Sequence, residues 1–369
     1  MEEWKEYRYT DLATIIGGGT PKTSVPEYWS GEIPWLSVKD FVSVTKYVYD
    51  TEKHISELGL LNSSTKLLEK NDIVISARGT VGAMAMIPDP MCFNQSCFGL
   101  RGNNIVDKNF LYYLTRTKVD ELRKTAHGSV FDTITRETFD NLRCLVPPLQ
   151  TQQKIGNILS SLDSKIELNK QINDNLEQQA ITIFDNMFPT VASGEDVIGD
   201  IITPKRGKGL LSKDAVEGNV PVVAGGLEPA TYHNESNTIA PVVTISASGA
   251  NAGYVNLWHI PVWSSDSSFI DSAMTSNIYF WYVMLKKRQK EIFDAQTGSA
   301  QPHIYPKHIA EMPLGKFDLS DVEKFTEIVT PMFEIRGKNL KESKRLAAVR
   351  DLLLPKLMSG KLKINDMNN

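Results

Sequence analysis

The sequence has few cysteines, no long apolar run and no excess of positive charge. Its three cysteines, Cys92, Cys97 and Cys144, form no CxxC pair, which argues against both a disulfide framework and a zinc site. The longest apolar run, residues 278–285, ends at two lysines and an arginine and is too short to span a membrane. Because the charged amino terminus also lacks the apolar segment of a signal peptide, we expect a cytoplasmic protein.

The net charge of −4 counts against a protein that binds nucleic acid without a partner, because neutralising phosphates requires a basic surface. A net charge can nevertheless hide a local basic patch, and a partner can supply contacts to the backbone of the nucleic acid. The 369 residues, 41% hydrophobic and 23% charged, suit a soluble globular protein of two or three domains.

The clearest pattern is an internal repeat. When the chain is displaced by 170 residues, identities recur at one unbroken offset, from Ile75 on Ile245 to Leu176 on Leu346. Between these ends lie Ser76, Ala77, Gly79, Phe110, Tyr112, Gly128, Ser129, Ile134 and Asn169, matched by Ser246, Ala247, Gly249, Phe280, Tyr282, Gly298, Ser299, Ile304 and Asn339. Upstream the offset is 187, so the first copy carries about 17 extra residues between Lys39 and Leu68, as surface loops allow.

Each copy predicts a mixed globular part followed by a long helix. Apolar runs and turn residues predict strands at 33–38, 71–77 and 84–87, turns at 17–21 and 207–209, and helices that begin near Asn109 and Asn277.

The long helices carry a heptad pattern. After Pro147 and Pro148, apolar residues recur at steps of four and three as far as Met187, and a proline follows at position 189. The second helix opens with the capping-box spacing Ser320-x-x-Glu323. Both seams are apolar at their ends and polar in the middle, which predicts an antiparallel pair whose polar centres face each other. The seam residues are Leu162, Ile166, Asn169, Asn173, Leu176, Met332, Asn339 and Leu346. Two separate amphipathic surface helices are the alternative.

A helix of about 40 residues is roughly 60 Å long. Two such helices, paired antiparallel, would act as a spacer between two similar domains. Half-sites one helical turn apart on DNA lie about 34–36 Å from each other, so this geometry is compatible with two domains on one duplex. A two-headed protein–protein adaptor satisfies the same geometry.

A series of short motifs accompanies the repeat. In the first copy they are Ile15-Ile16-Gly17-Gly18-Gly19-Thr20-Pro21, Tyr28-Trp29-x-Gly31-x-Ile33-Pro34-Trp35, Asp40, Ser76-Ala77-Arg78-Gly79-Thr80-Val81-Gly82, Asn94-Gln95, Gly128-Ser129, Ile134, Val146-Pro147-Pro148-Leu149 and Gln152-Gln153-Lys154-Ile155. In the second copy they are Ser246-Ala247-Ser248-Gly249-Ala250-x-Ala252-Gly253 and Leu354-x-Lys356-Leu357-Met358-Ser359-Gly360-Lys361-Leu362. In this order they resemble the DNA-specificity subunits of type I restriction-modification systems over nearly the whole chain. The second copy departs from the pattern with Ser265 in place of Gln95 and Val222 in place of Trp35.

The resemblance implies a mixed α/β fold with two similar target-recognition domains, residues 1–148 and 190–317, and two conserved spacer helices, residues 149–189 and 318–369. It implies a non-catalytic subunit whose domains each read half of a bipartite double-stranded DNA target. Its helices would set the spacing and dock two methyltransferase (modification) subunits, and restriction subunits that translocate DNA would join the full complex. S-adenosylmethionine, ATP and Mg would belong to those partners, so we expect no cofactor, metal or membrane contact in this chain.

Candidates for DNA contact come from both copies. Arg78 and Thr80 lie in a glycine-flanked loop after an expected strand, from which an arginine can reach a guanine edge or a phosphate. Ser248 and Asn251 occupy the equivalent loop. The remaining candidates are Lys22, Lys39, Lys205, Arg206, Lys208 and His303. The alternatives are solvated or salt-bridged side chains for the basic residues and local turn hydrogen bonds for the loop residues.

Catalytic signatures are missing from the sequence. Residues 17–23 lack the spacing of a phosphate-binding loop, and no dinucleotide-binding or methyltransferase motif follows an expected strand. His303 and His308 stand five apart without a further ligand cluster. A nuclease and a protein–protein adaptor are the two competing interpretations.

Overall fold

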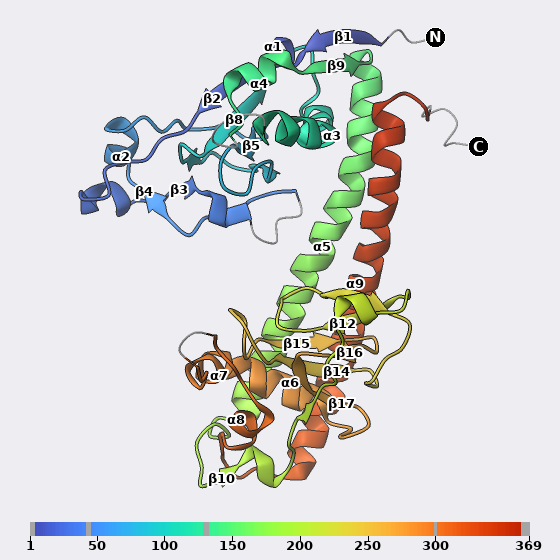
Figure 1. Cartoon of the computed structure of the whole chain (residues 1–369). Helices are drawn as coiled ribbons and strands as arrows, with labels where there is room; N and C mark the ends of the chain where they lie inside the picture. The colour runs from blue at the N-terminus through green and yellow to red at the C-terminus, as the bar shows by residue number, and fades with distance from the viewer. Residues whose placement is uncertain (1–3, 42–45, 128–132, 299–300, 363–369) are drawn as a thin grey trace. The chain divides into compact units, whose positions relative to one another are not determined.

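The computed structural model describes residues 4–41, 46–127, 133–298 and 301–362, and the repeat positions Gly128, Ser129 and Ser299 lie outside these ranges. The chain forms two compact units, coloured along the chain in Figure 1. Unit 1 comprises residues 1–168 and 342–369, and unit 2 comprises residues 169–341. Because the division falls inside both long helices, each unit contains one half of each helix.

The globular part of unit 1 contains three small sheets. Its strands are β1 (Lys5–Arg8), β2 (Ala13–Gly17), β3 (Ile33–Leu36), β4 (His54–Ile55), β5 (Ile73–Ser76), β6 (Met84–Met86), β7 (Cys92–Phe93), β8 (Cys97–Gly102) and β9 (Arg143–Val146). An antiparallel sheet has the order β2-β8-β5-β6. β3 pairs antiparallel with β4 and parallel with β7, and β1 pairs antiparallel with β9. The strands expected at 33–38, 71–77 and 84–87 are confirmed as β3, β5 and β6.

The helices of unit 1 pack on its sheets and on the long helices. They are α1 (Tyr9–Leu12), α2 (Glu57–Leu61), α3 (Lys108–His127) and α4 (Arg136–Asn141). The carboxylate of Asp107 accepts a hydrogen bond from the Phe110 backbone N–H at 2.9 Å, which caps the start of α3. Phe110 and residues of the same helix share one buried core with Leu159 and Leu357. The long-helix segments are therefore part of the core of unit 1.

The globular part of unit 2 repeats this topology. Its strands are β10 (Asp196–Val197), β11 (Lys205–Arg206), β12 (Val220–Val223), β13 (Thr231–His233), β14 (Val242–Ser246), β15 (Val255–Trp258), β16 (Trp263–Ser264), β17 (Ser267–Asp271) and β18 (Pro313–Leu314). The three sheets have the orders β11-β17-β14-β15, β13-β12-β16 and β10-β18. Strand directions also match, since β12 is antiparallel to β13 and parallel to β16. The internal repeat inferred from the sequence is thus a repeat of structure.

A helix formed by the longest apolar run of the sequence lies in the core of unit 2. The helices of this globular part are α6 (Ile278–Lys287), α7 (Gln289–Asp294) and α8 (Pro306–Ala310). Every residue of α6 from Ile278 to Leu285 is buried, as expected for a helix that is apolar on all sides. The ring of Tyr279 stacks on Phe333 with centroids 4.7 Å apart, and Phe184 lies 5.5 Å from Phe280. Residues of both long helices therefore complete this core as well.

The two long helices are α5 (Leu149–Met187) and α9 (Leu319–Met358). The Pro148 carbonyl accepts the first backbone hydrogen bonds of α5, at 2.9 and 3.1 Å. At α9 the Asp318 carbonyl has this role, at 3.0 and 3.3 Å. The prediction that Ser320 caps the second helix was therefore wrong, because the chain is already helical at Leu319 and Ser320 lies in the first turn.

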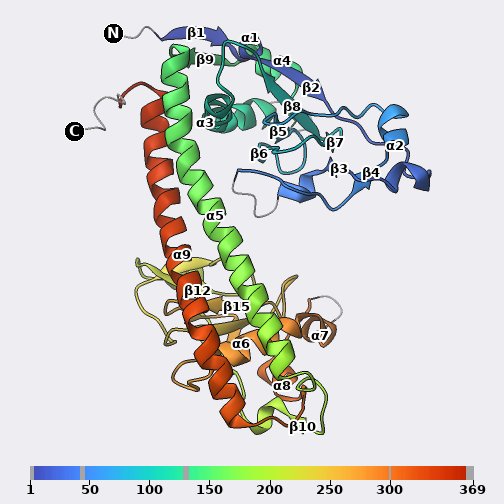
Figure 2. The same ribbon diagram turned by 180° about the vertical axis from the view of Figure 1, so that it is seen from behind.

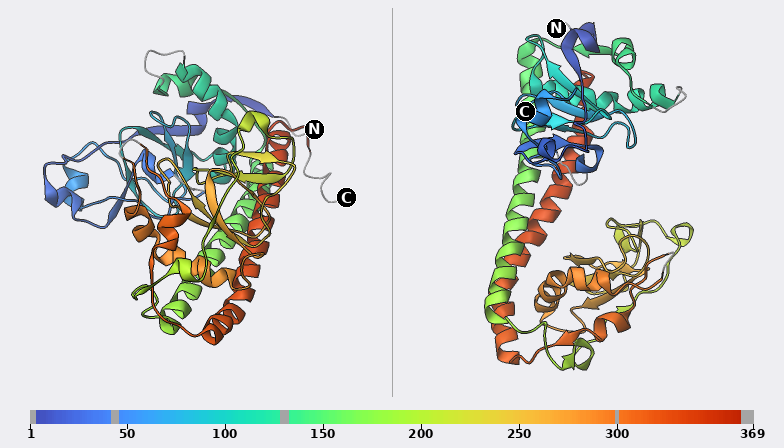
Figure 3. Two further views of the ribbon diagram at one scale, coloured as in Figure 1. Left: turned by 60° about the horizontal axis from the view of Figure 1, so that its bottom comes forward. Right: turned by 90° about the vertical axis from the view of Figure 1, so that its left-hand side faces the viewer.

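α5 and α9 pair antiparallel within each unit (Figures 1, 2 and 3). In unit 1, Lys165 lies 3.4 Å from Glu342. In unit 2, the Asn169 side-chain amide donates to the Asn339 carbonyl at 3.5 Å, and the Asn339 amide donates to Asn173 Oδ1 at 2.9 Å. Partner numbers fall along α9 as they rise along α5. The chain is a mixed α/β protein with two globular parts of one topology and two long antiparallel helices.

Candidate nucleic-acid interface

The β5–β6 loop of unit 1 presents Arg78 and Thr80, both exposed. Ser76 Oγ accepts a hydrogen bond from the Ala83 N–H at 2.9 Å and donates to the Thr80 carbonyl. Gly82 has a φ of +81°, and a Cβ at this position would lie 2.7 Å from a methyl group of α3; only glycine fits there without strain. The loop is thus a tightly held turn that presents an arginine to solvent.

The equivalent loop of unit 2 follows β14 and has the same backbone hydrogen bonds. The Ala247 N–H donates to the Asp266 carbonyl at 3.1 Å, and the Ala247 carbonyl accepts from the Ile304 N–H at 2.9 Å. Ala77 makes the same two bonds in unit 1, at 2.7 and 3.1 Å, with the residues 170 positions earlier. Gly253 has a φ of +87° and corresponds to the constrained glycine of the first loop.

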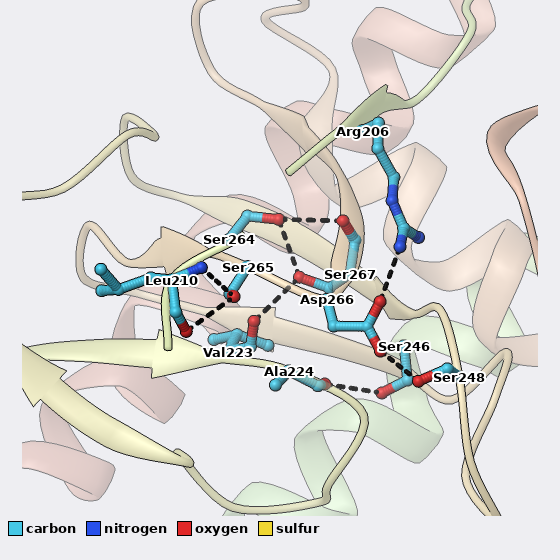
Figure 4. A network of polar contacts seen from close by, with 10 residues as sticks. All are labelled: Arg206, Leu210, Val223, Ala224, Ser246, Ser248, Ser264, Ser265, Asp266 and Ser267. Atoms are coloured by element: carbon cyan, nitrogen blue, oxygen red, sulfur yellow. Dashed lines mark hydrogen bonds and ion pairs between the residues drawn. The ribbon is translucent and has the colours of Figure 1, made fainter. Parts of the chain in front are cut away.

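A polar network joins three strand ends beside this second loop (Figure 4). Arg206, at the end of β11, donates from Nη2 to Asp266 Oδ1 at 2.6 Å. Ser248 Oγ donates to the other oxygen of the same carboxylate. Asn251, in the same loop, is half-buried and its carbonyl accepts from the Tyr254 N–H at 2.9 Å. Asp266 therefore brings two of the sequence candidates, Arg206 and Ser248, together.

His303 is brought to the same loop through its backbone. It pairs with Thr297, whose carbonyl accepts from the His303 N–H at 2.8 Å, and forms a bridge to Ser248. Its ring is stacked on Tyr305, with centroids 5.9 Å apart. Arg206, Ser248 and His303 thus surround one loop of unit 2.

The remaining lysines are exposed. Lys39 has 81% of its side chain exposed and lies 4.0 Å from Glu52, and the Lys22 carbonyl accepts from an indole N–H at 3.2 Å. No hydrogen bond or ion pair among the described residues joins either lysine to the Arg78 loop. In unit 2, Lys205 is exposed on β11, and the ammonium of Lys208 lies 6.0 Å from the centre of the Trp263 ring. These side chains suit phosphate contact better than reading of bases.

Two residues of these surfaces were not among the sequence candidates. Asp266 was missed because an acid is unexpected on a DNA-facing surface, although the repeat sets it on Ser96, directly after the Asn94-Gln95 motif. The other is Arg136, the first residue of α4. Its guanidinium lies beside Gly17 at the end of β2, where a Cβ added to the glycine would be 3.8 Å from Arg136 Nη2. No sequence pattern places Arg136 beside that strand end.

A buried ionic cluster joins the globular part of unit 1 to its helices. The Asp163 carboxylate on α5 accepts hydrogen bonds from Arg350 at 2.6 Å and from the Tyr113 hydroxyl at 2.5 Å. Lys46 is buried and donates to side chains of α3 and α5, both at 2.8 Å. Burial lowers the pKa of Lys46 to about 8, against the opposing effect of the Asp163 charge. These contacts position the domain on the helix pair and are no catalytic arrangement.

Unit 2 has its own polar cluster at a different level of the helices. Glu177 accepts from the Tyr282 hydroxyl at 2.7 Å and lies 3.3 Å from Arg336. Arg336 Nη1 is 3.2 Å from the ring of His259. Burial, together with the Arg336 charge, lowers the pKa of His259 to about 4.

The predicted seam residues differ in burial. Ile166, Asn169 and Asn173 are buried. The others, which are half-buried, are Leu162, Leu176, Met332, Asn339 and Leu346. On α5, among these seam residues, the acids Asp163 and Glu167 are buried as well. The heptad pattern places both acids beside the seam and not in it.

Neither a metal cluster nor a membrane span is found in the part of the chain that the structure describes. Within residues 4–41, 46–127, 133–298 and 301–362, no group of three His, Cys, Asp or Glu residues could hold a metal ion. No helix of these ranges is long and apolar enough to cross a membrane.

Comparison with known proteins identifies the class. Residues 1–178 match the family model of the type I restriction modification DNA specificity domain. The MjaIX type I restriction enzyme specificity subunit of Methanocaldococcus jannaschii is 26% identical over 411 aligned positions, covering 99% of this chain and 95% of that protein. The EcoR124I/EcoR124II specificity subunit of Escherichia coli is 30% identical over 170 positions, covering 44% and 41%. The S subunit of a type I system from M. genitalium has the same fold, with a TM-score of 0.59, 20% identity and 96% of each chain covered.

Residues 1–178 are therefore a type I DNA specificity domain. Over nearly its whole length the chain is similar to a specificity subunit of a type I restriction enzyme.

Proposed function

We propose that this subunit reads a bipartite double-stranded DNA target, one half with the globular part of each unit. The observation that carries the proposal is the duplicated frame. Both parts have the same three sheets and the same backbone hydrogen bonds around the loop that follows β5 in unit 1 and β14 in unit 2. The side chains on the two loops differ. Two similar frames with different side chains suit two half-sites of different sequence.

The candidate contacts divide by chemistry. Arg78, Thr80, Arg206, Ser248, Asn251 and His303 lie on or beside the two equivalent loops, and we assign base reading to this group. Lys22, Lys39, Lys205 and Lys208 are exposed cations, and we assign them to phosphates, which orient a protein on the duplex without reading sequence.

DNA and the other subunits of the restriction-modification system are the partners of this family. In finer detail, we propose that the paired helices set the distance between the half-sites and dock two modification subunits, with restriction subunits joining the full assembly. S-adenosylmethionine, ATP and Mg would be bound by those partners, and the chain would carry out its role in the cytoplasm.

The experiment is a map of methylated adenines. The chain is expressed with its modification subunits in a host without adenine methylation, and the genome is read by long-read sequencing. We expect one motif of two specified parts separated by a constant number of unspecified bases, absent when the chain is omitted. A single continuous motif, or methylation that does not depend on the chain, would contradict the proposal.

A further inference from the structure

The two units can be compared position by position around the shared loop. Two pairs of positions have equivalent backbone hydrogen bonding, a third pair directly follows the equivalent residues Ala77 and Ala247, and all three pairs differ in residue type. They are Gly17, Arg78 and Ser96 in unit 1 and Arg206, Ser248 and Asp266 in unit 2. All six lie at least partly at the surface. Since the frames are alike, a difference in the bases that the two domains read must come from side chains at such positions.

Arg206 has the chemistry for reading a base. Its side chain is 41% exposed and donates one hydrogen bond, from Nη2 to Asp266. Nε and Nη1 have no partner among the described residues, so the guanidinium keeps enough donors for two parallel hydrogen bonds. Guanine offers two acceptors, O6 and N7, at the matching spacing in the major groove.

Asp266 is informative because a carboxylate repels phosphates. Its two oxygens are taken by Arg206 and by the Ser248 hydroxyl, and Ser264 and Ser267 hydrogen bond to each other behind it at 2.7 Å (Figure 4). The carboxylate is therefore held on both sides and restricts the conformations of Arg206. An arginine held in this way loses less freedom when it binds.

We propose that Arg206, positioned by Asp266, reads a guanine in the half-site bound by unit 2. This inference rests on the proposed bipartite reading and adds the residue pair and the base. In unit 1 the position of Arg206 is occupied by Gly17, and arginines reach the equivalent surface from the loop itself, as Arg78, and from α4, as Arg136.

The test uses the full chain with its modification subunits and the methylome assay. For Arg206→Ala, one G·C position in one half of the motif should become unspecified, with discrimination at that position falling about 5- to 150-fold. Asp266→Asn should relax the same position to a smaller extent, because the arginine remains but is less well positioned. Arg78→Ala should affect only the other half. Lys205→Ala, a neighbour on β11, is the matched control and should lower methylation without changing the motif.

Several outcomes would overturn the inference: an unchanged motif in Arg206→Ala, relaxation at an A·T position, or equal weakening of both halves, which would indicate phosphate contact only. Arg206→Gln, which keeps the side-chain bulk, provides a second variant should the alanine variant fail to assemble. If the unaltered chain directs no bipartite motif, the proposed function fails; if it does and Arg206→Ala leaves that motif intact, only this inference fails.

Discussion

Removal of Arg350 should destabilise unit 1 strongly, because it leaves the Asp163 carboxylate buried without its main cation. The Asp163 side chain is fully buried and that of Arg350 is 10% exposed, with 2.6 Å between the charged atoms. Breaking a buried ion pair by deleting one partner costs about 3–5 kcal/mol. We expect Arg350→Met to fall near the lower end, about 3 kcal/mol, because Lys46 and the Tyr113 hydroxyl still face the carboxylate. For a unit of this size that corresponds to roughly 6–12 °C in Tm.

The reciprocal substitution should cost less. Asp163→Asn keeps an acceptor for Tyr113, and Arg350 retains Asp351, whose carboxylate lies 2.9 Å from Arg350 Nε. Loss of a charge-assisted hydrogen bond amounts to about 1.5–3 kcal/mol, and the remaining contact with Asp351 favours the lower end of that range. The double variant should be more stable than the sum of the single losses predicts, because it removes the uncompensated charge.

The assay is thermal and denaturant unfolding of the full chain for both single variants and the double variant. Arg116→Met is the matched control: its ion pair with Asp351, at 3.1 Å, is partly exposed and should contribute less than about 1 kcal/mol. Equal losses for Arg350→Met and Arg116→Met, or strictly additive single losses, would refute the reasoning.

Four further outcomes follow from the described structure. Burial holds the folded-state pKa of Lys46 near 8, below its ordinary 10.5, so the unfolded chain binds more protons between these values and stability rises with pH. Denaturation at pH 7.5 and 9.5 should therefore show the wild type gaining roughly 2 kcal/mol relative to Lys46→Met. The folded-state pKa of His259, about 4, is likewise below its ordinary 6.5. The free energy of unfolding should therefore decrease as pH falls from 6.5 towards 4. In denaturation at these pH values, His259→Asn should lose less stability than the wild type. Gly82→Ala should cost about 1–2 kcal/mol for its left-handed backbone, measurable by thermal unfolding, and should weaken methylation of one half-site. Insertion of one heptad in each long helix, about 10.5 Å of helix, should lengthen the unread gap in the motif by about three base pairs, and an unchanged gap would count against the spacer role.

The frame of the molecule could be predicted from the sequence because it depends on local and repeated signals. Turn glycines, short apolar strands and helix starts give β3, β5, α3 and α6, and a single offset links the two copies. The extra segment of the first copy was also located, and it includes α2. Such features depend on residues that are neighbours in the chain or on one comparison of the chain with itself.

The side-chain networks could not be predicted, since they depend on contacts between distant residues. The heptad pattern assigns Leu162 to the seam, yet Asp163 is fully buried while Leu162 is half-buried. A straight helix drifts from a strict heptad by about 20° per repeat, and the globular part covers a second face of α5, which widens the buried stripe. Lys46, Asp163 and Arg350 come from three separate segments of the chain, and no spacing in the sequence predicts that they lie close together.

The polar clusters differ between the two units, although the backbone topology is repeated. By the offset of 170, Asp163 corresponds to Phe333 and Arg350 to Ala180, both buried and apolar in the core of unit 2. Two acids on α5 pair with arginines of α9: the buried Asp163 with Arg350, and the half-buried Glu177 with Arg336. If α5 paired with the α5 of a second copy in the same geometry, each acid would face an apolar residue and remain unpaired, at about 3–5 kcal/mol for the buried Asp163 and less for the half-buried Glu177. The backbone repeat alone would permit such an exchange, and the distribution of charge between the helices disfavours it.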